Sequence, residues 1–324
     1  MTRRVVAITN PRSASGRTGK RWPAIRADLA ARGLAVDVRM TAGPGDATAL
    51  TRRAIAEGYD LIVAVGGDGT INEVVNGFFP SNGGAATPAS DAPALGVIPS
   101  GSGGDFRRSL GVPCEIAAAV DVIASGTARP CDVGRLTSAA GGEARHFINI
   151  ADCGVGGEVA ARVNASRGKR IGGTPAFFFH SMSVLMSYRA RAVEIELDGE
   201  LLERTVQNVV VANGRAFGGG MQVAPHACLD DGLFDIVIIN AASRLRTARD
   251  MPLVYRGRHI GRDGVELRRA TTVSVRHAAG EEPLLFEAEG EDFGATGAVL
   301  TCLPNAIRVY AGAGAAFAKP WLAR

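Results

Sequence analysis

The feature that most constrains this chain is an apolar strand that runs directly into a glycine turn. Leu61 to Val65 is wholly apolar, and Gly66-Gly67-Asp68-Gly69-Thr70 follows it at once. Ile71, Val74 and Val75 then carry helical spacing. A strand, a tight turn and a helix N-terminus present free backbone N–H groups and the positive end of a helix dipole to an anion. The sequence therefore predicts a phosphate site at this turn.

Each residue type in the turn suits that chemistry. Glycines allow the backbone to approach a phosphate closely. Asp68 can orient Mg²⁺ or its waters, and Thr70 can cap the helix or contact phosphate. An ordinary glycine-rich turn is the alternative interpretation, and the position at the end of an apolar strand disfavours it. Neither G-x-x-x-x-G-K-[ST] nor a G-x-G-x-x-G after a strand occurs in the chain, which excludes the two commonest nucleotide folds by motif.

The first part of the chain alternates short β-branched runs with helical patterns. We expect strands at 4–9, 34–40, 61–65, 94–98 and 128–133, and helices around 22–29, 50–55 and 115–125. Such alternation predicts an α/β domain, a parallel sheet with helices on both faces, over residues 1–135. Ligands of such sheets bind at the carboxyl ends of the strands. The stretch from Pro80 to Pro93 has no periodicity and is expected to be a surface loop.

After Arg135 the pattern changes to short strands at close spacing, which predicts a mainly antiparallel β-sandwich over residues 136–324. The last residues have the option of returning to the first domain. Helices are expected only at 156–166, 176–186 and 245–255. The expected strands are 147–151, 193–197, 206–212, 234–239, 265–267, 271–276, 284–288, 299–303 and 306–310.

Composition narrows the class of protein. The length of 324 residues with 46% hydrophobic residues suits two folded domains, and a net charge of +4 suits an anionic partner such as ATP or an acidic membrane surface. No aromatic-plus-basic module accompanies the charge, so nucleic acid is not an expected partner. Five scattered cysteines without a C-x-x-C indicate neither disulfides nor a cysteine zinc site. Without a signal-like or membrane-spanning apolar run, we expect a cytoplasmic protein that contacts membranes only peripherally.

Several motifs together carry a family resemblance. Gly66 to Val74 resembles the nucleotide motif of the diacylglycerol kinase catalytic family, which includes bacterial lipid kinases and sphingosine and ceramide kinases. Asn10-Pro11 with Gly16 is similar to the family's opening loop, and Ile98 to Phe106 to its second glycine loop. The C-terminal motifs that match are Val211 to Gly214, Gly218 to Gly220, Pro225 and Asp231 to Asp235. The resemblance spans nearly the whole chain.

The resemblance implies an ATP-dependent phosphotransferase with an alcohol acceptor, whose active site lies in the cleft between an α/β domain and a β-sandwich. It implies transfer of the γ-phosphoryl group to a lipid hydroxyl of diacylglycerol-like or sphingoid type, with Mg²⁺ as cofactor. The residues implied to line the nucleotide are Thr41, Gly66, Gly67, Asp68, Gly69, Thr70, Ile71, Asn72 and Ser102. The network at Mg²⁺ would be Asp68, Asp105 and Asp132. A second, structural metal would use the carbonyls of Cys228 and Leu233 and the carboxylate of Asp231.

Two positions depart from the family pattern. Gly104 stands where the family usually has Asn, which removes a side-chain amide. Glu289-Gly290-Glu291 stands where the family has Asp-Gly-Glu, whose Asp takes the proton of the substrate hydroxyl. Glu289 offers the same chemistry with one more methylene, about 1 Å of extra reach, so we expect it to be the catalytic base. A literal Asp198-Gly199-Glu200 also occurs, and its position between apolar strands predicts a hairpin turn.

Some alternatives stay open at this point. Because the Gly-Gly-Asp-Gly-Thr loop also resembles that of NAD kinases, a kinase of a soluble substrate is one. A nucleotide-binding protein that has lost catalysis is another, given Gly104 and Glu289. Arg167, Lys169 and Arg170 before Pro175 to Phe179 fit a membrane-docking edge or a solvated loop equally well. Arg107 and Arg108 fit a solvated helix start or a phosphate contact. A homodimer is a further option, and the lipid itself is not specified by the sequence.

Overall fold

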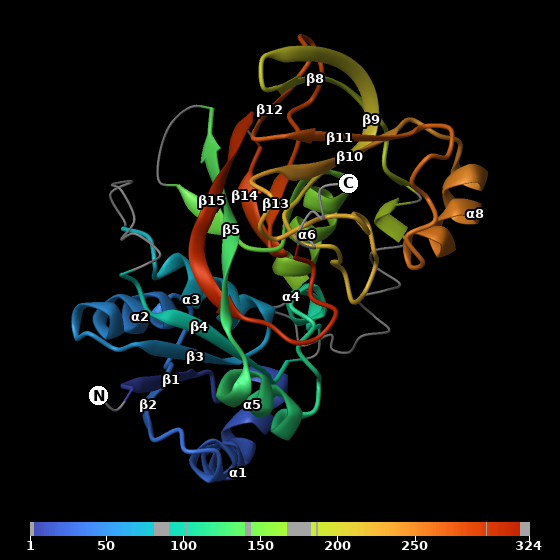
Figure 1. The fold of residues 1–324 in the computed structure, drawn as a ribbon. Coiled ribbons are helices and arrows are strands. Elements are labelled where there is room, and N and C mark those ends of the chain that lie inside the picture. Colours follow the sequence, from blue (N-terminus) through green and yellow to red (C-terminus); the bar gives the residue numbers. More distant parts are fainter. Residues whose placement is uncertain are drawn as a thin grey trace, which may run out of the picture.

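A computed structural model describes residues 3–80, 91–101, 103–139, 144–166, 183–185, 187–295 and 297–317. Figure 1 shows an α/β half in blue and cyan and a β-rich half in green to red, joined by two long strands. Ser102, the basic residues Arg167 to Arg170 and nearly all of the helix expected at 176–186 lie outside the described residues. The same is true of most of the loop expected between Pro80 and Pro93.

The N-terminal half is built on four parallel strands, β1 (Val5–Thr9), β2 (Val36–Met40), β3 (Leu61–Gly66) and β4 (Ala94–Pro99), in the order β2-β1-β3-β4. Every residue of β1 and β3 is buried. This burial explains why these strands are continuous apolar runs, since a parallel sheet is covered on both faces. The predicted parallel sheet is confirmed.

Helices cover both faces of this sheet, as predicted. Helices α1 (Arg17–Ala31) and α5 (Ile116–Ser125) contribute Ile25, Leu29 and Ile123 to the apolar cluster on one face. Helices α2 (Asp46–Ala56) and α3 (Asp68–Asn76) pack on the other face (Figure 1). A short helix α4 (Asp105–Ser109), which the periodicity did not predict, follows the second glycine loop. None of the helices in the described ranges is long and apolar enough to cross a bilayer.

The C-terminal half is antiparallel, as predicted. It contains β6 (Arg145–Phe147), β7 (Ile150–Gly154), β8 (Arg191–Leu197), β9 (Glu200–Ala212), β10 (Phe234–Asn240), β11 (Val265–Ala270), β12 (Thr272–His277), β13 (Phe286–Ala288) and β14 (Glu291–Gly294), with helices α6 (Val155–Ser166) and α8 (Arg244–Val254).

One predicted strand in this half is wrong in extent. The run 147–151 is broken at Ile148 and Asn149, because the backbone N–H groups of both residues donate to the Glu289 carboxyl group instead of to a neighbouring strand.

The hairpin prediction at Asp198-Gly199 is confirmed. These two residues join β8 to β9 with φ values of 47° and 94°, the left-handed pair that a tight hairpin requires. The Asp198 carboxylate accepts hydrogen bonds from the Thr271 and Thr272 backbone N–H groups, so this acid is structural.

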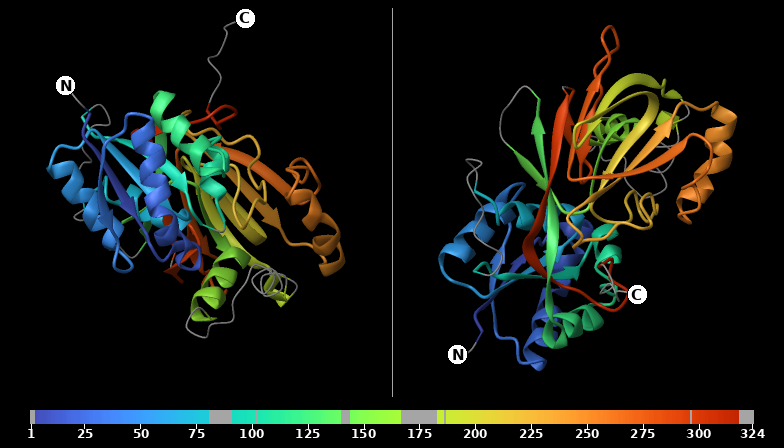
Figure 2. Two further views of the ribbon diagram at one scale, coloured as in Figure 1. Left: turned by 90° about the horizontal axis from the view of Figure 1, so that it is seen from below. Right: turned by 45° about the horizontal axis from the view of Figure 1, so that its top comes forward.

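Two strands run through both halves. Strand β5 (Ala128–Ser138) pairs antiparallel with β15 (Ala298–Tyr310), and β15 also pairs with β12 at one end and lies parallel to β4 at the other. The strands expected at 299–303 and 306–310 are therefore one strand, with a register shift between Leu303 and Ile307. The right-hand view of Figure 2 shows this red and green ribbon linking the two halves. The division expected between residues 135 and 136 lies inside β5.

Candidate active site

The first glycine turn lies at the carboxyl edge of the parallel sheet. Strand β3 ends at Gly66 and helix α3 begins at Asp68. No described side chain caps α3, so its first-turn N–H groups are available to an anion. A Cβ atom placed on Gly69 would meet no heavy atom within 4 Å among the described residues, which shows open space beside the turn. The predicted phosphate cradle therefore has both donors and room.

The second glycine loop packs directly against the first. The Ser100 N–H donates to the Gly66 carbonyl at 2.7 Å. A Cβ atom on Gly101 would lie 2.4 Å from the Gly67 Cα atom, so no larger residue fits there without moving the backbone. This close approach explains why position 101 needs glycine, whereas a Cβ atom on Gly67 would lie 3.4 Å from the Gly101 Cα atom, an ordinary contact.

Asp68 organises the second loop. Its carboxylate accepts backbone hydrogen bonds from Gly104 at 2.7 Å and from Asp105 and Phe106, both at 3.3 Å. Gly104 has φ of 68°, in the left-handed region that glycine adopts freely and asparagine adopts more readily than most residues. Replacement of the family's usual Asn by Gly104 thus keeps the backbone conformation and removes only the side chain.

Asp105 joins the two halves of the molecule. Its carboxylate accepts a hydrogen bond from the Gly219 N–H at 2.9 Å and pairs with the Arg108 guanidinium at 2.7 Å. Burial raises the pKa of Asp105, the Gly219 N–H opposes that rise, and the negative charge of Asp68 adds to it. The structure therefore brings Asp68 and Asp105 together. Arg108 contacts Asp105 and the carbonyls of the second loop, which is more than a solvated helix start.

Asp132 lies apart from that pair. Its carboxylate accepts hydrogen bonds from the Gly232 and Asn305 N–H groups, each at 2.7 Å. Burial raises its pKa, and the acids that add to the shift are Asp231 and Asp230. Asp132 thus connects β5 to the bulge of β15 and to the 231–234 segment, whereas its expected neighbours Asp68 and Asp105 bind elsewhere.

The donor set at Asp68 and Asp105 fits Mg²⁺ that arrives with a nucleotide. In the described part of the chain, no group of three His, Cys, Asp or Glu side chains is placed to hold a metal by itself. Mg²⁺ commonly keeps several waters and is bound by one or two carboxylates plus substrate phosphates. Two neighbouring carboxylates beside a phosphate cradle meet that requirement.

Two of the other residues expected at the nucleotide lie at the same sheet edge. The Thr41 N–H donates to the Thr9 carbonyl at 3.0 Å, just beyond the end of β2. The Thr70 hydroxyl accepts a hydrogen bond from the Asn10 side chain at 3.0 Å, which ties the opening loop to α3.

Ile71 and Asn72 face inward. The Ile71 side chain is 1% exposed and belongs to the apolar core, so only its backbone is near the turn. Asn72 is also buried, and its Oδ1 atom accepts a hydrogen bond from Asn76. Ser102 lies outside the described residues.

Glu289 occupies a corner directly after β13. Its φ is 57°, and its Oε1 atom accepts hydrogen bonds from the N–H groups of Ile148 at 2.9 Å and Asn149 at 2.6 Å. Desolvation raises the pKa of this carboxyl group to about 8, those two hydrogen bonds oppose the rise, and the Asp68 charge adds to it. The negative charge of Asp68 thus contributes to the rise in the pKa of Glu289, although the two residues belong to different halves of the molecule. A carboxyl group that titrates near neutral pH is suited to accept a proton.

A second acidic pair beside Glu289 escaped the sequence analysis. Glu287 on β13 and Asp152 on β7 are register partners, 4% and 2% exposed. Burial raises the pKa of Asp152 to about 7 and that of Glu287 well above its ordinary value, so the pair retains a proton at neutral pH. Glu287 also accepts a hydrogen bond from the Gly290 N–H at 2.6 Å, which fixes the Glu289 corner. The period-two spacing of Glu287 and Glu289 is the signal that could have revealed it.

The position expected for a structural metal contains an ion pair. The Asp231 carboxylate lies 3.5 Å from the Arg269 guanidinium, which also donates to Asp235 at 2.8 Å. The other Asp231 oxygen accepts a hydrogen bond from the Leu233 N–H at 3.2 Å, and Cys228 lies three residues before Asp231. Since the only carboxylate of this set already faces a cation, these residues fit a salt bridge better than a second metal ion.

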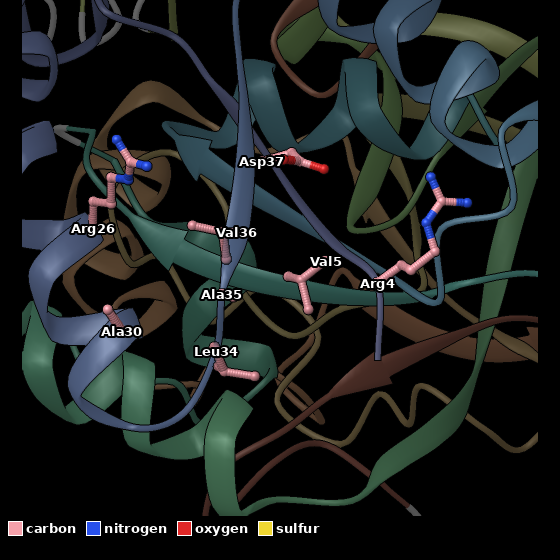
Figure 3. Close-up of a pocket in the computed structure, with 8 residues that line it drawn as sticks. All are labelled: Arg4, Val5, Arg26, Ala30, Leu34, Ala35, Val36 and Asp37. Carbon is pink, nitrogen blue, oxygen red and sulfur yellow. The ribbon is translucent and has the colours of Figure 1, made fainter. Parts of the chain in front are cut away.

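A pocket of about 490 Å³ lies elsewhere, where β1 and β2 begin, and is lined by Arg4, Arg26 and Asp37 among others (Figure 3). The Arg4 guanidinium already donates to the Glu57 and Gly58 carbonyls and lies over the Tyr59 ring. This pocket is at the opposite end of the sheet from the glycine loops, so it is not the phosphate site.

The uncapped N-terminus of α3 at the edge of a parallel sheet, joined to an antiparallel half that carries the Glu289 carboxyl group, is an arrangement that two-domain kinases can use. Residues 4–136 match the diacylglycerol kinase catalytic domain, and residues 149–311 match the YegS C-terminal NAD kinase beta sandwich-like domain. The chain belongs to the diacylglycerol kinase catalytic family, and with it to the phosphotransferases that act on an alcohol group.

Individual relatives agree with this assignment. The chain is 36% identical to the diacylglycerol kinase of Bacillus subtilis (strain 168) over 80% of both chains. It is 32% identical to that of Staphylococcus carnosus (strain TM300), over 96% of this chain and 95% of the relative. A solved structure from Bacillus anthracis str. Sterne, described as a diacylglycerol kinase, has a TM-score of 0.70 at 22% identity over 96% of this chain and 98% of its own. A second structure from that organism has a TM-score of 0.74 at 25% identity, over 96% of both chains.

Proposed function

We propose that this protein transfers the γ-phosphoryl group of ATP to the hydroxyl group of a diacylglycerol-like or sphingoid lipid. The observation that carries the proposal is the corner in which the Ile148 and Asn149 N–H groups hold the Glu289 carboxyl group, together with the uncapped N-terminus of α3 at the glycine turn. Phosphoryl transfer depends on a phosphate cradle, charge neutralisation and a base, and these residues supply a candidate for each role.

The roles divide between the two halves. The first-turn N–H groups of α3 bind the phosphates, and Asp68 and Asp105 are the residues that would hold Mg²⁺, which would neutralise phosphate charge. The Glu289 carboxylate takes the proton of the lipid hydroxyl while the hydroxyl oxygen attacks the γ-phosphorus and ADP leaves. The Ile148 and Asn149 N–H groups orient Glu289 for this step.

The extra methylene of Glu289, compared with the family's Asp, has a use in this chain. It brings Oε1 to within 2.9 Å of both N–H donors at the break between β6 and β7. What supports retained catalysis is the pKa of about 8, because a carboxyl group that titrates near neutral pH can accept a proton there.

The test is transfer from Mg-ATP to a panel that contains diacylglycerol, sphingoid bases and NAD, followed by mass spectrometry of the products. A phospholipid is the expected product, and Asp68→Ala should abolish it. Asp28→Ala on α1, an exposed acid of the same type, is the matched control and should retain the rate. ATP binding without transfer to any lipid would refute the substrate class, and transfer to NAD would assign the chain to kinases of soluble substrates.

A further inference from the structure

The net charge of the chain is concentrated in one short segment. Residues 243–263, here called the α8 surface, contain six arginines and two aspartates, a net charge of +4 that equals the net charge of the whole chain. The rest of the molecule is therefore balanced. The arginines are Arg244, Arg246, Arg249, Arg256, Arg258 and Arg262, and the aspartates are Asp250 and Asp263.

Helix α8 lies on the outside of the C-terminal half, at the far edge of the molecule in both views of Figure 2. None of its residues is buried. Thr247 contacts Gln207 on β9, and Val254 packs against an apolar cluster of the sheet, so these two side chains mark the inner face of the helix. Leu245 is 82% exposed, the most exposed of the large hydrophobic side chains described.

The outward face combines this leucine with arginine. Leu245, Arg249 and Pro252 are spaced by four and three residues, which places them on one stripe of α8, and all three are exposed. Arg256, in the turn that follows the helix, is also exposed. An apolar residue flanked by arginines on an exposed helix face is typical of segments that lie at the interface of a lipid bilayer.

Among the described residues, part of the arginine charge of the α8 surface has no counter-charge. Asp250 pairs with Arg246, Arg249 and Arg262, and Asp263 pairs with Arg246. These paired arginines and Asp263 line a hollow of about 810 Å³ between α8 and Gly261–Asp263. Within the described ranges, no carboxylate forms an ion pair with Arg244, Arg256 or Arg258. Guanidinium groups of this kind can bind a phosphate group in bidentate fashion.

The α8 surface is continuous with the candidate active site. Tyr255 follows α8 directly, and its pKa is raised by burial and by the negative charge of Asp105. His259 bonds through its ring to the Val223 carbonyl at 3.0 Å, and Val223 follows the Gly218–Gly220 loop whose N–H group binds Asp105. The segment that follows α8 therefore approaches the Asp105 side of the candidate site, whereas α8 itself lies at the outer edge of the molecule.

We propose that the α8 surface docks on an anionic phospholipid bilayer, with Leu245 inserted among the acyl chains and the arginines on lipid phosphates. The proposal rests on the lipid kinase function proposed above, and it goes beyond it by naming the face that meets the membrane. Arginine close to an acidic membrane gains binding free energy that salt screens.

The test is sedimentation with phosphatidylcholine vesicles that contain or lack phosphatidylglycerol, without ATP or lipid substrate. Wild type should bind the anionic vesicles and be released by salt, and Arg249→Glu/Arg256→Glu should lower the affinity by at least about tenfold. Arg21→Glu/Arg53→Glu, the same charge change on α1 and α2, is the control and should bind as wild type does. Equal losses in both variants, no loss in the α8 variant, or tighter binding of wild type to duplex DNA than to vesicles would overturn the proposal.

A kinase assay separates the two proposals. With a short-chain diacylglycerol dispersed in detergent, the α8 variant should phosphorylate at the wild-type rate, and with the same lipid in anionic vesicles it should be slower. Vesicle binding that depends on α8 without phosphorylation of any lipid would refute the enzyme function and leave docking intact. Phosphorylation that is equally fast in both formats for both variants would refute docking alone.

Discussion

The glycine loops and the Glu289 corner solve opposite electrostatic problems with the same kind of side chain. At the loops, the Asp68 carboxylate accepts three backbone hydrogen bonds at the open edge of a parallel sheet. At the corner, antiparallel strands enclose Glu289 beside the Asp152 and Glu287 pair, and burial raises the pKa of all three carboxyl groups. In one region the backbone is organised around a carboxylate, and in the other burial favours the protonated form of the carboxyl groups.

The largest expected effect comes from removing the proton acceptor alone. Glu289→Gln keeps the hydrogen bonds from Ile148 and Asn149 but cannot take a proton, so kcat should fall by about a hundredfold to ten-thousandfold. ATP affinity, measured by titration calorimetry, should stay unchanged. Asp68→Asn should instead weaken ATP binding, because it loosens the second loop. If Glu289→Gln kept the wild-type kcat, Glu289 would not be the proton acceptor.

The pH dependence of kcat/KM should follow the titration of Glu289 and not that of the acids in the glycine loops. Because the Glu289 pKa is raised to about 8, its base form increases as pH rises. We expect kcat/KM to fall about tenfold per unit below pH 8 and to level off above it. Glu289→Asp should change the midpoint. A kcat/KM that does not change between about pH 6 and about pH 9 would contradict the assignment of Glu289 as base. The protein must stay folded over this range.

Stability should respond to the same group in a defined direction. The folded-state pKa of Glu289 lies above its unfolded value, so its contribution is fully present below the unfolded pKa and is lost as pH rises through about 8. The free energy of unfolding of wild type should therefore fall relative to that of Glu289→Gln as pH rises from the unfolded-state pKa to about 8. Urea unfolding at several pH values measures this difference. Parallel curves for the two proteins would show that the carboxyl group is not desolvated.

The smallest expected effect concerns Asp231, the carboxylate expected at a structural metal, which forms an ion pair with Arg269. Chelation of divalent metals should change the wild-type Tm by no more than about 1 °C. Arg269→Ala should lower the Tm, and added Mg²⁺ should restore part of it, since an unpaired carboxylate then becomes available. Arg268→Ala, on the same strand but paired with Glu266, is the control. A large Tm loss of wild type in chelator would establish a structural metal instead.

The parts of the fold that depend on short-range patterns could be predicted. The parallel sheet follows from alternation of strand and helix, the hairpin follows from Asp198-Gly199, and the phosphate cradle follows from glycines at the end of an apolar strand. Asp68 came from the chemistry of the glycine turn and Glu289 from the family resemblance, and the Asp68 charge contributes to the raised pKa of Glu289.

The rest depends on partners distant in the sequence. Asp132 lies 99 residues before Asp231, and Glu287 lies 135 residues after Asp152, so no local pattern reveals which acids meet. The break at Ile148 and Asn149 exists because Glu289 binds their N–H groups. Likewise, the sequence predicts two strands where β15 is one, because the apolar pattern is interrupted at the bulge. There the backbone N–H of Asn305 donates to the Asp132 carboxylate, which is distant in the sequence.

The pairing of β5 with β15 also determines where the chain can be cut into fragments that still fold. Strand β15 lies beside β4, and Ile307, Val309 and Phe317 complete the apolar cluster of the N-terminal half. A fragment ending near residue 135 would leave the β4 edge unpaired and that cluster open, which favours edge-to-edge aggregation. The N-terminal half of the intact chain is therefore expected to complete its fold only after β15 has been synthesised.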